Sequence, residues 1–321
     1  MSAFLGIDIA KKKFDAALLR DGKFKTKVFD NSTTGFNTLT TWIKDLDVGK
    51  VHICMEATGS FYERLALFLS ESGFLVSVIN PFQIKSFGES MLSRTKTDKA
   101  DARVIARFCE ALIPPPWQPD PPKIRALRDL GRRRDALINM RTQEMNREAV
   151  ENPRVITSIK SIMAVLEEEI EQISQLIKDH INSHPDLKRK SDLLRTIPGV
   201  GDVTIETILS EVNGFEKFKS ATQVVAYMGL SPREKTSGSS VRCKAHICKT
   251  GNTRLRKVLF MPAMVAIQRN PSVKALYDRL KAKSKNGFII ACACMRKLMH
   301  IIFGVIKNNK PFDPLLHLNN G

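Results

Sequence analysis

The chain has 321 residues, of which 43% are hydrophobic and 26% are charged. This balance excludes a disordered chain, and the length allows two or three domains. Lysine and arginine total 51 against 33 acidic residues, so the formal net charge is +18 and the pattern indicates a polyanionic partner, most often a nucleic acid.

The first part of the chain alternates between strands and helices. Three predicted strands come first, and the second and third are joined by an Asp21-Gly22 turn. The predicted order is strands at 3–9, 14–20 and 23–30, a helix at 35–46, a strand at 51–55, a helix at 61–72, a strand at 75–79 and a helix at 97–112. Hairpin-linked strands followed by strands alternating with helices are typical of a ribonuclease H-like α/β sheet.

Two long helices are predicted in the middle of the chain. A basic helix runs from about 124 to 149, and Pro153 interrupts it. The isoleucines and leucine at 159, 162, 166, 170, 173, 177 and 181 then recur at alternating steps of three and four, which is a heptad seam. This seam could pack on the same chain or on a second copy. A break at His184-Pro185 suggests a domain boundary near 189.

The last part is predicted to be mostly helical with a polar, basic centre at 231–252. Helices are predicted at 203–212, 253–268, 272–284 and 288–307. The turn Ile197-Pro198-Gly199-Val200-Gly201 resembles a helix-hairpin-helix motif, whose glycines let backbone N–H groups approach a phosphate. A tight turn between two helices is the alternative.

Positive charge is concentrated in this last part. Residues 1–188 hold 28 basic and 25 acidic side chains, a net charge of +3, whereas residues 189–321 hold 23 and 8, a net charge of +15. Between Glu234 and Asp278 there are nine lysines or arginines and no acid. An acid-free run of this length predicts contact with nucleic acid rather than a merely solvated surface.

Six cysteines form no CxxC pair, and no apolar segment of signal-peptide length precedes Lys11. We therefore expect reduced thiols in a cytoplasm or nucleoid. Cys243, His246 and Cys248 have no second ligand pair nearby, which argues against zinc there. The apolar stretch 288–306 contains two basic residues and a histidine, which predicts a buried helix rather than a membrane span.

Four acids stand where a metal-dependent nuclease needs them. Asp8 lies inside the first apolar strand, where a carboxylate is costly unless it is paired or metal-bound. Glu56 follows the strand at 51–55, which neighbours the first strand in a ribonuclease H-like sheet. Asp98 and Asp101 share one face of a helix. Carboxylates of this kind hold Mg²⁺ ions that activate a nucleophile and stabilise a leaving oxygen. Taken singly, these acids could instead cap helices.

A second candidate lies in Thr236-Ser237-Gly238-Ser239-Ser240. A serine beside glycine in a basic loop can present its hydroxyl to a phosphate, although serine needs a base or metal to take its proton. A plain Ser/Gly turn is the alternative, and composition alone does not choose among the three serines.

These motifs together resemble the DEDD transposases of bacterial insertion sequences, which are relatives of the Piv/MooV site-specific DNA invertases. The resemblance runs from about residue 3 to 312. It rests on six motifs in the right order and spacing: Gly6-Ile7-Asp8-Ile9-Ala10-Lys11, Glu56-Ala57-Thr58-Gly59, Lys96-Thr97-Asp98-Lys99-Ala100-Asp101-Ala102, Ile197-Pro198-Gly199-Val200-Gly201, Gly229-Leu230-Ser231-Pro232-Arg233 and Ser237-Gly238-Ser239-Ser240.

The resemblance implies three domains. They are a RuvC-like catalytic domain with a basic helical extension at 1–152, a coiled-coil connector at 153–188, and a mostly helical transposase domain at 189–321. It further implies that Asp8, Glu56, Asp98 and Asp101 are catalytic metal ligands for Mg²⁺, for which Mn²⁺ can substitute. The spacing from Pro232-Arg233 implies that Ser237 is the nucleophile.

The family implies an RNA-guided DNA recombinase that mobilises its own insertion sequence through a transient phosphoserine link. Its partners would be donor and target DNA, a noncoding guide RNA from its own element, and further copies in a dimer or tetramer, with no membrane. We expect nucleic-acid contacts at the glycines and basic residues Gly199, Gly201, Arg242, Lys244, Lys249, Arg254, Arg256 and Lys257. The alternatives are a RuvC-like nuclease that cuts by water attack and a non-catalytic nucleic-acid-binding protein.

Overall fold

The structure is a computed structural model that describes residues 3–57, 59, 61–91, 97–147, 152–233, 236–237, 241–242 and 246–314. The chain divides into two compact units, residues 1–119 and residues 120–321. The boundary predicted between residues 152 and 153 falls inside the second unit.

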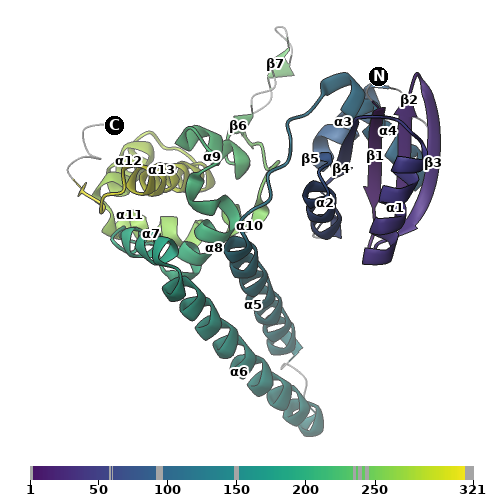
Figure 1. Ribbon diagram of the computed structural model, residues 1–321. Helices are drawn as coiled ribbons and strands as arrows, with labels where there is room; N and C mark the ends of the chain where they lie inside the picture. The colour runs from purple at the N-terminus through teal and green to yellow at the C-terminus, as the bar shows by residue number, and fades with distance from the viewer. Residues whose placement is uncertain are drawn as a thin grey trace. The chain divides into compact units, whose positions relative to one another are not determined.

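A five-stranded mixed sheet in the order β3-β2-β1-β4-β5 forms the centre of the first unit (Figure 1). β1, β2 and β3 pair antiparallel, whereas β4 and β5 continue the sheet in parallel with β1. The strands are β1 (Ala3–Ile9), β2 (Lys13–Arg20), β3 (Lys23–Asp30), β4 (Val51–Glu56) and β5 (Leu75–Ile79). The α/β prediction for this part of the chain is confirmed, and each strand lies within one residue of its expected position.

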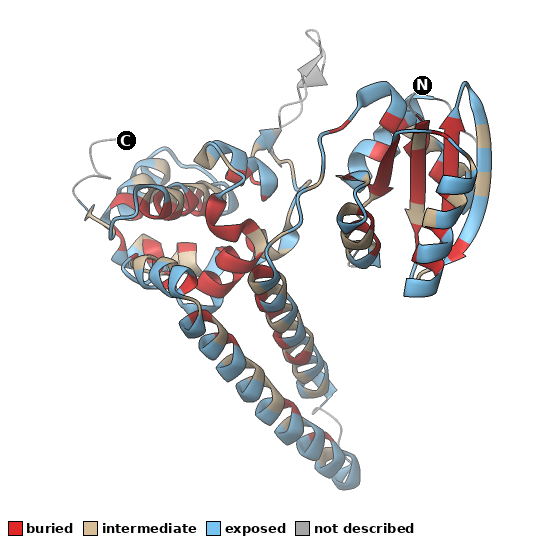
Figure 2. Cartoon of the chain, viewed as in Figure 1, coloured by how far each residue is buried: buried red, intermediate tan, exposed pale blue. Residues whose placement is uncertain are grey.

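Helices cover both faces of this sheet. They are α1 (Thr33–Asp45), α2 (Phe61–Glu71), α3 (Pro81–Ser90) and α4 (Asp98–Leu112). Strand alternation sends Leu5 and Ile7 of β1 into the core with α1 and α2. The opposite side chains face α4, where Cys54 of β4 joins Ile105 and Phe108 in a smaller core. Figure 2 shows the strands between these layers as the most buried part of the unit.

Helix α3 is absent from the sequence prediction, which has Asn80-Pro81 ending a strand. In the structure this dipeptide begins a helix instead. The Asn80 side chain accepts a hydrogen bond from the Phe82 N–H at 2.9 Å, and Pro81 occupies the first helical turn, where its missing N–H costs nothing.

The second unit is mostly helical, as predicted, and α13 lies at its centre. Cys294, Leu298 and Ile302 of α13 are fully buried. Among the described residues, α13 is the one helix long and apolar enough to cross a membrane, and more than half of its apolar window is buried inside the unit. The helices are α5 (Pro122–Arg147), α6 (Pro153–Ser183), α7 (Pro185–Arg195), α8 (Asp202–Val212), α9 (Ala221–Tyr227), α10 (Thr253–Val258), α11 (Phe260–Arg269), α12 (Pro271–Ala282) and α13 (Gly287–Asn308), with a 3₁₀ turn at Asn213–Phe215.

Helices α5 and α6 form a long antiparallel pair (Figure 1). Ile159, Leu166 and Ile177 of the heptad seam are buried in this pair, and His180 hydrogen-bonds the Lys123 carbonyl of α5 at 2.8 Å. The seam therefore packs on the same chain. Ile162, which the sequence counts in the seam, is exposed instead.

The polar centre of the second unit contains short strands rather than a plain loop. Pro232–Arg233 (β6) pairs antiparallel with His246–Ile247 (β9), and Thr236–Ser237 (β7) pairs with Val241–Arg242 (β8). The β7–β8 ladder lies between β6 and β9 in the sequence, and we call these four strands the hairpin arm.

Candidate active site

Asp8 and the first turn of α4 meet on one face of the sheet. Gly6 lies on this face two residues before Asp8, and a Cβ on Gly6 would stand 2.1 Å from the Ala102 carbonyl oxygen of α4. Only glycine permits so close an approach, and it brings α4 directly onto β1. Asp98 and Asp101 lie in the first turn of α4, where the Thr97 side chain accepts a hydrogen bond from the Ala100 N–H at 3.2 Å.

Glu56 reaches the same face from β4. The parallel register pairs Gly6 with Cys54 and Ile7 with Met55, so Glu56 is the next residue along the strand, beside Asp8. Neighbouring residues in a parallel pair point their side chains the same way. The structure therefore places the other three acids near enough to act on the charge of Asp8, although no three of the four carboxylates have oxygens within 4.8 Å of one another.

The pKa of Asp8 is shifted by burial and by the acids around it. Its pKa is raised from 3.8 to about 6, first because the carboxyl is partly withdrawn from water, and then because of the negative charges of Asp101, Glu56, Asp98 and Asp15. Four carboxylates acting on a fifth make a strongly negative site.

Asp15 belongs to this site, although the sequence analysis does not single it out. It lies directly opposite Asp8 in the β1–β2 ladder and is only 9% exposed. Lys13 stands between two of the acids, with its Nζ 3.8 Å from Asp15 Oδ2 and 3.1 Å from Asp98 Oδ2. Had the antiparallel register of the strands at 3–9 and 14–20 been predicted from the sequence, it would have placed Asp15 opposite Asp8.

The site fits a divalent cation. Its donors are carboxylate oxygens, which Mg²⁺ and Mn²⁺ prefer, and the raised pKa of Asp8 shows a negative charge that Lys13 does not fully offset. Asp8, Glu56, Asp98 and Asp101 are the side chains that would hold such an ion.

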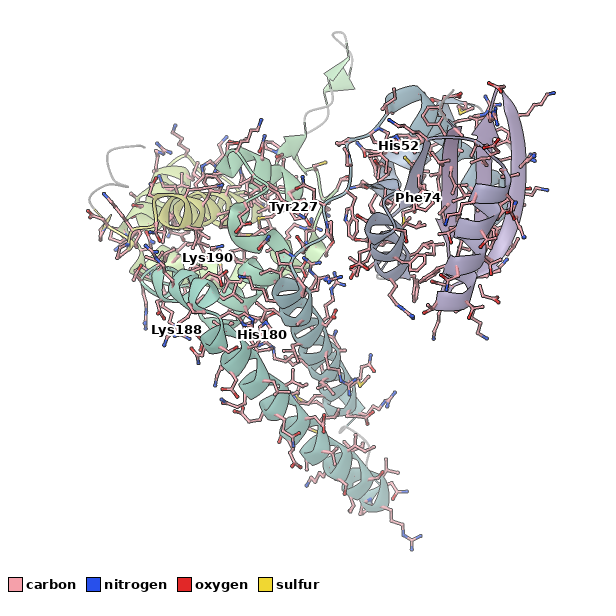
Figure 3. All side chains as sticks on the ribbon, viewed as in Figure 1. His52, Phe74, His180, Lys188, Lys190 and Tyr227 are labelled. Carbon is pink, nitrogen blue, oxygen red and sulfur yellow. The ribbon has the colours of Figure 1, made fainter. Side chains whose placement is uncertain are left out.

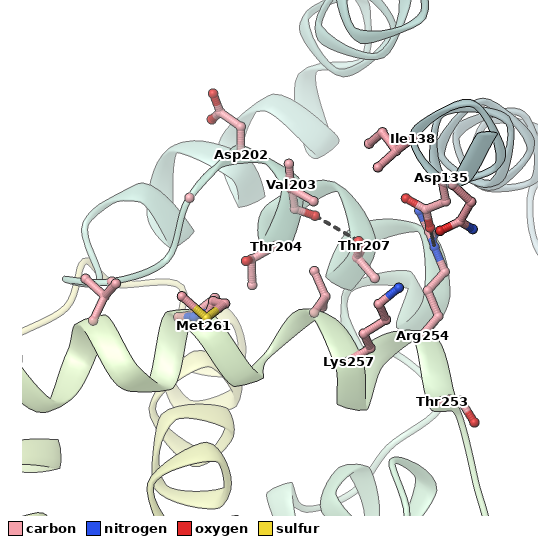
Figure 4. Close-up of a pocket in the computed structure, with 16 residues that line it drawn as sticks. Asp135, Ile138, Asp202, Val203, Thr204, Thr207, Thr253, Arg254, Lys257 and Met261 are labelled. Carbon is pink, nitrogen blue, oxygen red and sulfur yellow. Dashed lines mark hydrogen bonds and ion pairs between the residues drawn. The ribbon is translucent and has the colours of Figure 1, made fainter. Parts of the chain in front are cut away.

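Gly199 and Gly201 serve different purposes in the second unit. Gly199 has φ +97°, and a Cβ there would stand 2.9 Å from the Pro262 carbonyl oxygen and 3.0 Å from the Ala266 nitrogen, so this glycine permits close packing on α11. Gly201 caps α8 and has open space around it. Both line a pocket of about 690 Å³ between α5, α8 and α10–α11, which Lys257 also borders (Figure 4).

The basic residues expected to bind nucleic acid fall into two groups. Arg254 donates hydrogen bonds to Asp135 at 2.6 Å, Glu206 at 3.1 Å and Glu211 at 3.2 Å. Burial lowers the pKa of this guanidinium, but the three carboxylates outweigh burial and hold the pKa above its ordinary value. Arg256 donates to the carbonyl oxygen of Met228 at 2.8 Å.

Lys249 and Lys257 make up the other group, because both are exposed. The backbone of Arg242 lies in β8, and Lys244 lies outside the described residues. These positions remain predictions for nucleic-acid contact. The guanidiniums of Arg254 and Arg256 already have protein partners.

Ser237 belongs to the hairpin arm of the second unit. It closes β7 and pairs with Val241 of β8, directly before residues 238–240. The other two candidate serines, Ser239 and Ser240, lie outside the described residues.

A mixed α/β unit with converging carboxylates, followed by a strongly basic helical unit, defines an enzyme class that acts on nucleic acid. Comparison with known proteins identifies the family. Residues 5–149 match the family model of the IS110 DEDD transposases, and residues 191–278 match a model described as transposases of the IS116/IS110/IS902 family.

Full-length relatives agree with these matches. The chain is 34% identical over 317 residues to the pilin gene-inverting proteins of Moraxella bovis and Moraxella lacunata, with 98% of each chain covered. It is 26% identical over 285 residues to the transposase for insertion sequence element IS1328 of Yersinia enterocolitica, covering 78% of this chain and 82% of that one. The chain belongs to the IS110 family of DEDD transposases and DNA invertases, and it is a DNA recombination enzyme.

Proposed function

We propose that the chain is a metal-dependent, RNA-guided DNA recombinase that mobilises its own insertion sequence through a phosphoserine link at Ser237. The convergence of Asp8, Glu56, Asp98 and Asp101 is the observation that carries this proposal. The first unit then acts as a ribonuclease H-like, RuvC-like catalytic domain, and Ser237 of the second unit is the proposed nucleophile.

The bound Mg²⁺ or Mn²⁺ would polarise a DNA phosphate and lower the pKa of the attacking hydroxyl. The Ser237 Oγ attacks the phosphorus and loses its proton, while one bridging oxygen of the DNA leaves as a hydroxyl group. The serine–phosphate bond conserves the energy of the phosphodiester. A hydroxyl from another strand then displaces Ser237 and restores the DNA backbone without a high-energy cofactor.

The protein's own groups prepare this step. Asp15 and Asp98 hold Lys13 at the edge of the carboxylates, which keeps a positive charge beside the position of an incoming phosphate. Gly6 fixes α4 against β1, so Asp98 and Asp101 keep their place relative to Asp8. The exposed Lys249 and Lys257 supply counter-charges for a nucleic-acid backbone.

We propose a guide RNA from the same element because the resemblance to the family implies one, and the charge of +15 in residues 189–321 suits RNA as well as DNA. We also propose a dimer or tetramer. The apolar residues Val155, Ile162, Val165 and Leu176 of α6 are each at least 40% exposed, although the heptad seam is filled by α5. The α5–α6 pair thus supports the proposed connector role. A protein of this kind would work in the bacterial cytoplasm, associated with the nucleoid.

Denaturing electrophoresis of the protein with DNA carrying the element ends tests the chemistry. A covalent protein–DNA adduct should form, depend on Mg²⁺ or Mn²⁺, and map to Ser237 by peptide sequencing. Ser237→Ala should bind DNA but form no adduct, and Ser239→Ala and Ser240→Ala are the matched controls. Strand cleavage without any adduct in the wild type would instead favour a nuclease that uses water. Sequencing of copurified RNA tests the guide.

A further inference from the structure

A buried polar cluster lies beneath the acid site, on the α4 side of the sheet. His52 and Cys54 of β4 and Cys109 of α4 each offer a ligand atom, and these three atoms lie within 4.8 Å of one another. In the part of the chain that the structure describes, this is the only set of three or more histidine, cysteine or acidic side chains so placed. His52 is 5% exposed, and the two cysteines are fully buried.

Three separate elements build this cluster. Strand alternation turns His52 and Cys54 to the same face of β4, and α4 brings Cys109 down onto that face, where its Sγ lies 3.7 Å from the His52 carbonyl oxygen. Ser77 of β5 lies opposite Cys54 in the parallel register. Its Oγ lies 2.8 Å from His52 Nε2. Figure 3 labels His52 in the first unit.

The chemistry of the donors selects the metal. One imidazole nitrogen and two thiol sulfurs suit Zn²⁺, whereas Mg²⁺ and Mn²⁺ prefer oxygen. Zn–S bonds of about 2.3 Å and Zn–N bonds of about 2.0 Å place tetrahedral ligand atoms roughly 3.5–3.8 Å apart. Side-chain rotations that change these separations by about 1 Å or less would bring the three ligand atoms to such distances. Ser77 Oγ, which lies 2.8 Å from His52 Nε2, is an oxygen beside the cluster that could take the fourth position.

The rest of this core argues that the cluster is more than packing. Its other members are apolar: Ile79, Ile84, Ile105 and Phe108. Four groups that can bind a metal, drawn from β4, β5 and α4, meet at one point in that apolar surrounding. Polar groups so placed are costly unless hydrogen bonds or a metal ion satisfy them. Without metal, Ser77 donates to the carbonyl oxygens of Pro114 and Pro115, and Cys109 donates to that of His52.

We propose that His52, Cys54 and Cys109 bind a structural Zn²⁺ ion, with Ser77 beside its fourth position. This site is separate from the carboxylate site, since its ligands are soft and its place is the core. It joins the two elements that carry the acids. Cys54 precedes Glu56 by two residues on the same face of β4, and Cys109 follows Asp101 by about two turns on α4. The zinc ion would hold the distance between them.

Metal analysis of the full-length protein tests this site. The protein is expressed with added ZnSO₄, purified with a reducing agent and dialysed, and its zinc content is measured by mass spectrometry. We expect about one zinc ion per chain in the wild type. We expect the same content in Cys292→Ser, which alters a half-exposed thiol of the second unit, and none in Cys54→Ser or Cys109→Ser.

Cobalt substitution gives a readout that does not depend on the folding of the variants. Co²⁺ bound to the wild type should show sulfur-to-metal charge transfer and the visible bands of a tetrahedral ion. A wild-type protein that binds neither Zn²⁺ nor Co²⁺ would overturn the proposal. So would zinc that persists in Cys54→Ser but is lost in Cys248→Ser, since the metal would then belong to the hairpin arm.

Discussion

Both units bury acidic side chains, but the surroundings of Glu206 in the second unit differ from those of Asp8 in the first. Glu206 of α8 is 1% exposed and lies between Arg134 at 2.5 Å and Arg254 at 3.1 Å. Burial raises the pKa of Glu206, and the two arginines oppose that rise. In the first unit, Asp8 has other carboxylates around it, and its pKa rises to about 6.

This difference distinguishes acids that stabilise the fold from acids that are available for metal binding or catalysis. Paired acids such as Glu206 hold α5, α8 and α10 together, because breaking a buried pair leaves a lone charge in the core. Burial and the neighbouring acids disfavour the charged form of Asp8 and therefore weaken the metal-free fold at neutral pH. A protein retains such a cluster where a cation or a reaction uses it. Each prediction below tests this contrast.

The largest effect is expected from the first unit. Asp101→Asn should lower strand cleavage by about 1,000-fold or more, equivalent to about 4 kcal/mol in the barrier, and leave DNA binding unchanged. Quantitative cleavage assays and DNA-binding curves measure the effects on cleavage and on binding separately. Glu110→Gln, an exposed acid of the same helix, is the control and should keep full activity. Cleavage by Asp101→Asn at the wild-type rate would remove this residue from the reaction.

In the second unit, replacing a paired residue should lower stability rather than cleavage chemistry. Arg254→Met leaves Glu206 with one arginine and Asp135 and Glu211 without their closest cation, which should cost about 3–5 kcal/mol in the free energy of unfolding. Urea denaturation followed by circular dichroism measures this loss, with Lys257→Met as the exposed control. Native stability combined with weakened DNA binding would instead make Arg254 a nucleic-acid contact.

Stability in the first unit should depend on pH through Asp8. A carboxyl whose pKa is higher in the folded protein binds its proton more tightly there, so stability falls as the pH rises from about 4 to 6 and stays low above. Asp8→Asn removes this penalty. Because solvent partly screens the site, we expect a gain on the order of 1–2 kcal/mol at pH 7.5 without metal.

Below pH 4 the gain from Asp8→Asn should vanish, because Asp8 is then protonated in both states. Urea titrations of the full chain at pH 3.5 and 7.5, with EDTA, measure the difference. Asp30→Asn, an exposed acid at the end of β3, is the control. A variant that is less stable than the wild type at pH 7.5 would show that the Asp8 charge stabilises the fold.

Much of this arrangement could be predicted because it follows from local patterns. The strand at 3–9 is apolar apart from one acid, and Asp98 and Asp101 share a helical turn, so three of the four acids could be placed on elements before any pairing was known. Asp15 could not, because its role depends on the β1–β2 register, in which a shift of one residue turns the side chain to the other face.

The second unit was harder to predict because charge does not show where a side chain goes. Arg254 stands in an acid-free run of sequence, yet its partners Asp135 and Glu206 come from helices far away in the chain. The break predicted at His184-Pro185 is confirmed, since α6 ends at Ser183 and Pro185 begins α7. Long-range pairing decided the position of the Arg254 side chain.

The smallest effect concerns the two exposed lysines of the basic run. If Lys249 and Lys257 each contact a phosphate, replacing one by alanine should reduce the slope of log affinity against log salt by about 0.9 for duplex DNA, or about 0.7 for a single strand. Replacing both should roughly double the change. Lys160→Ala, an exposed lysine on α6, is the control and should leave the slope unaltered. Neither lysine has a carboxylate partner among the described ion pairs, so the free energy of unfolding should stay constant in these variants. In Arg254→Met it should fall. An unchanged slope for the double variant would show that these two charges face solvent and contact no phosphate. The phosphate contacts would then have to come from the hairpin arm.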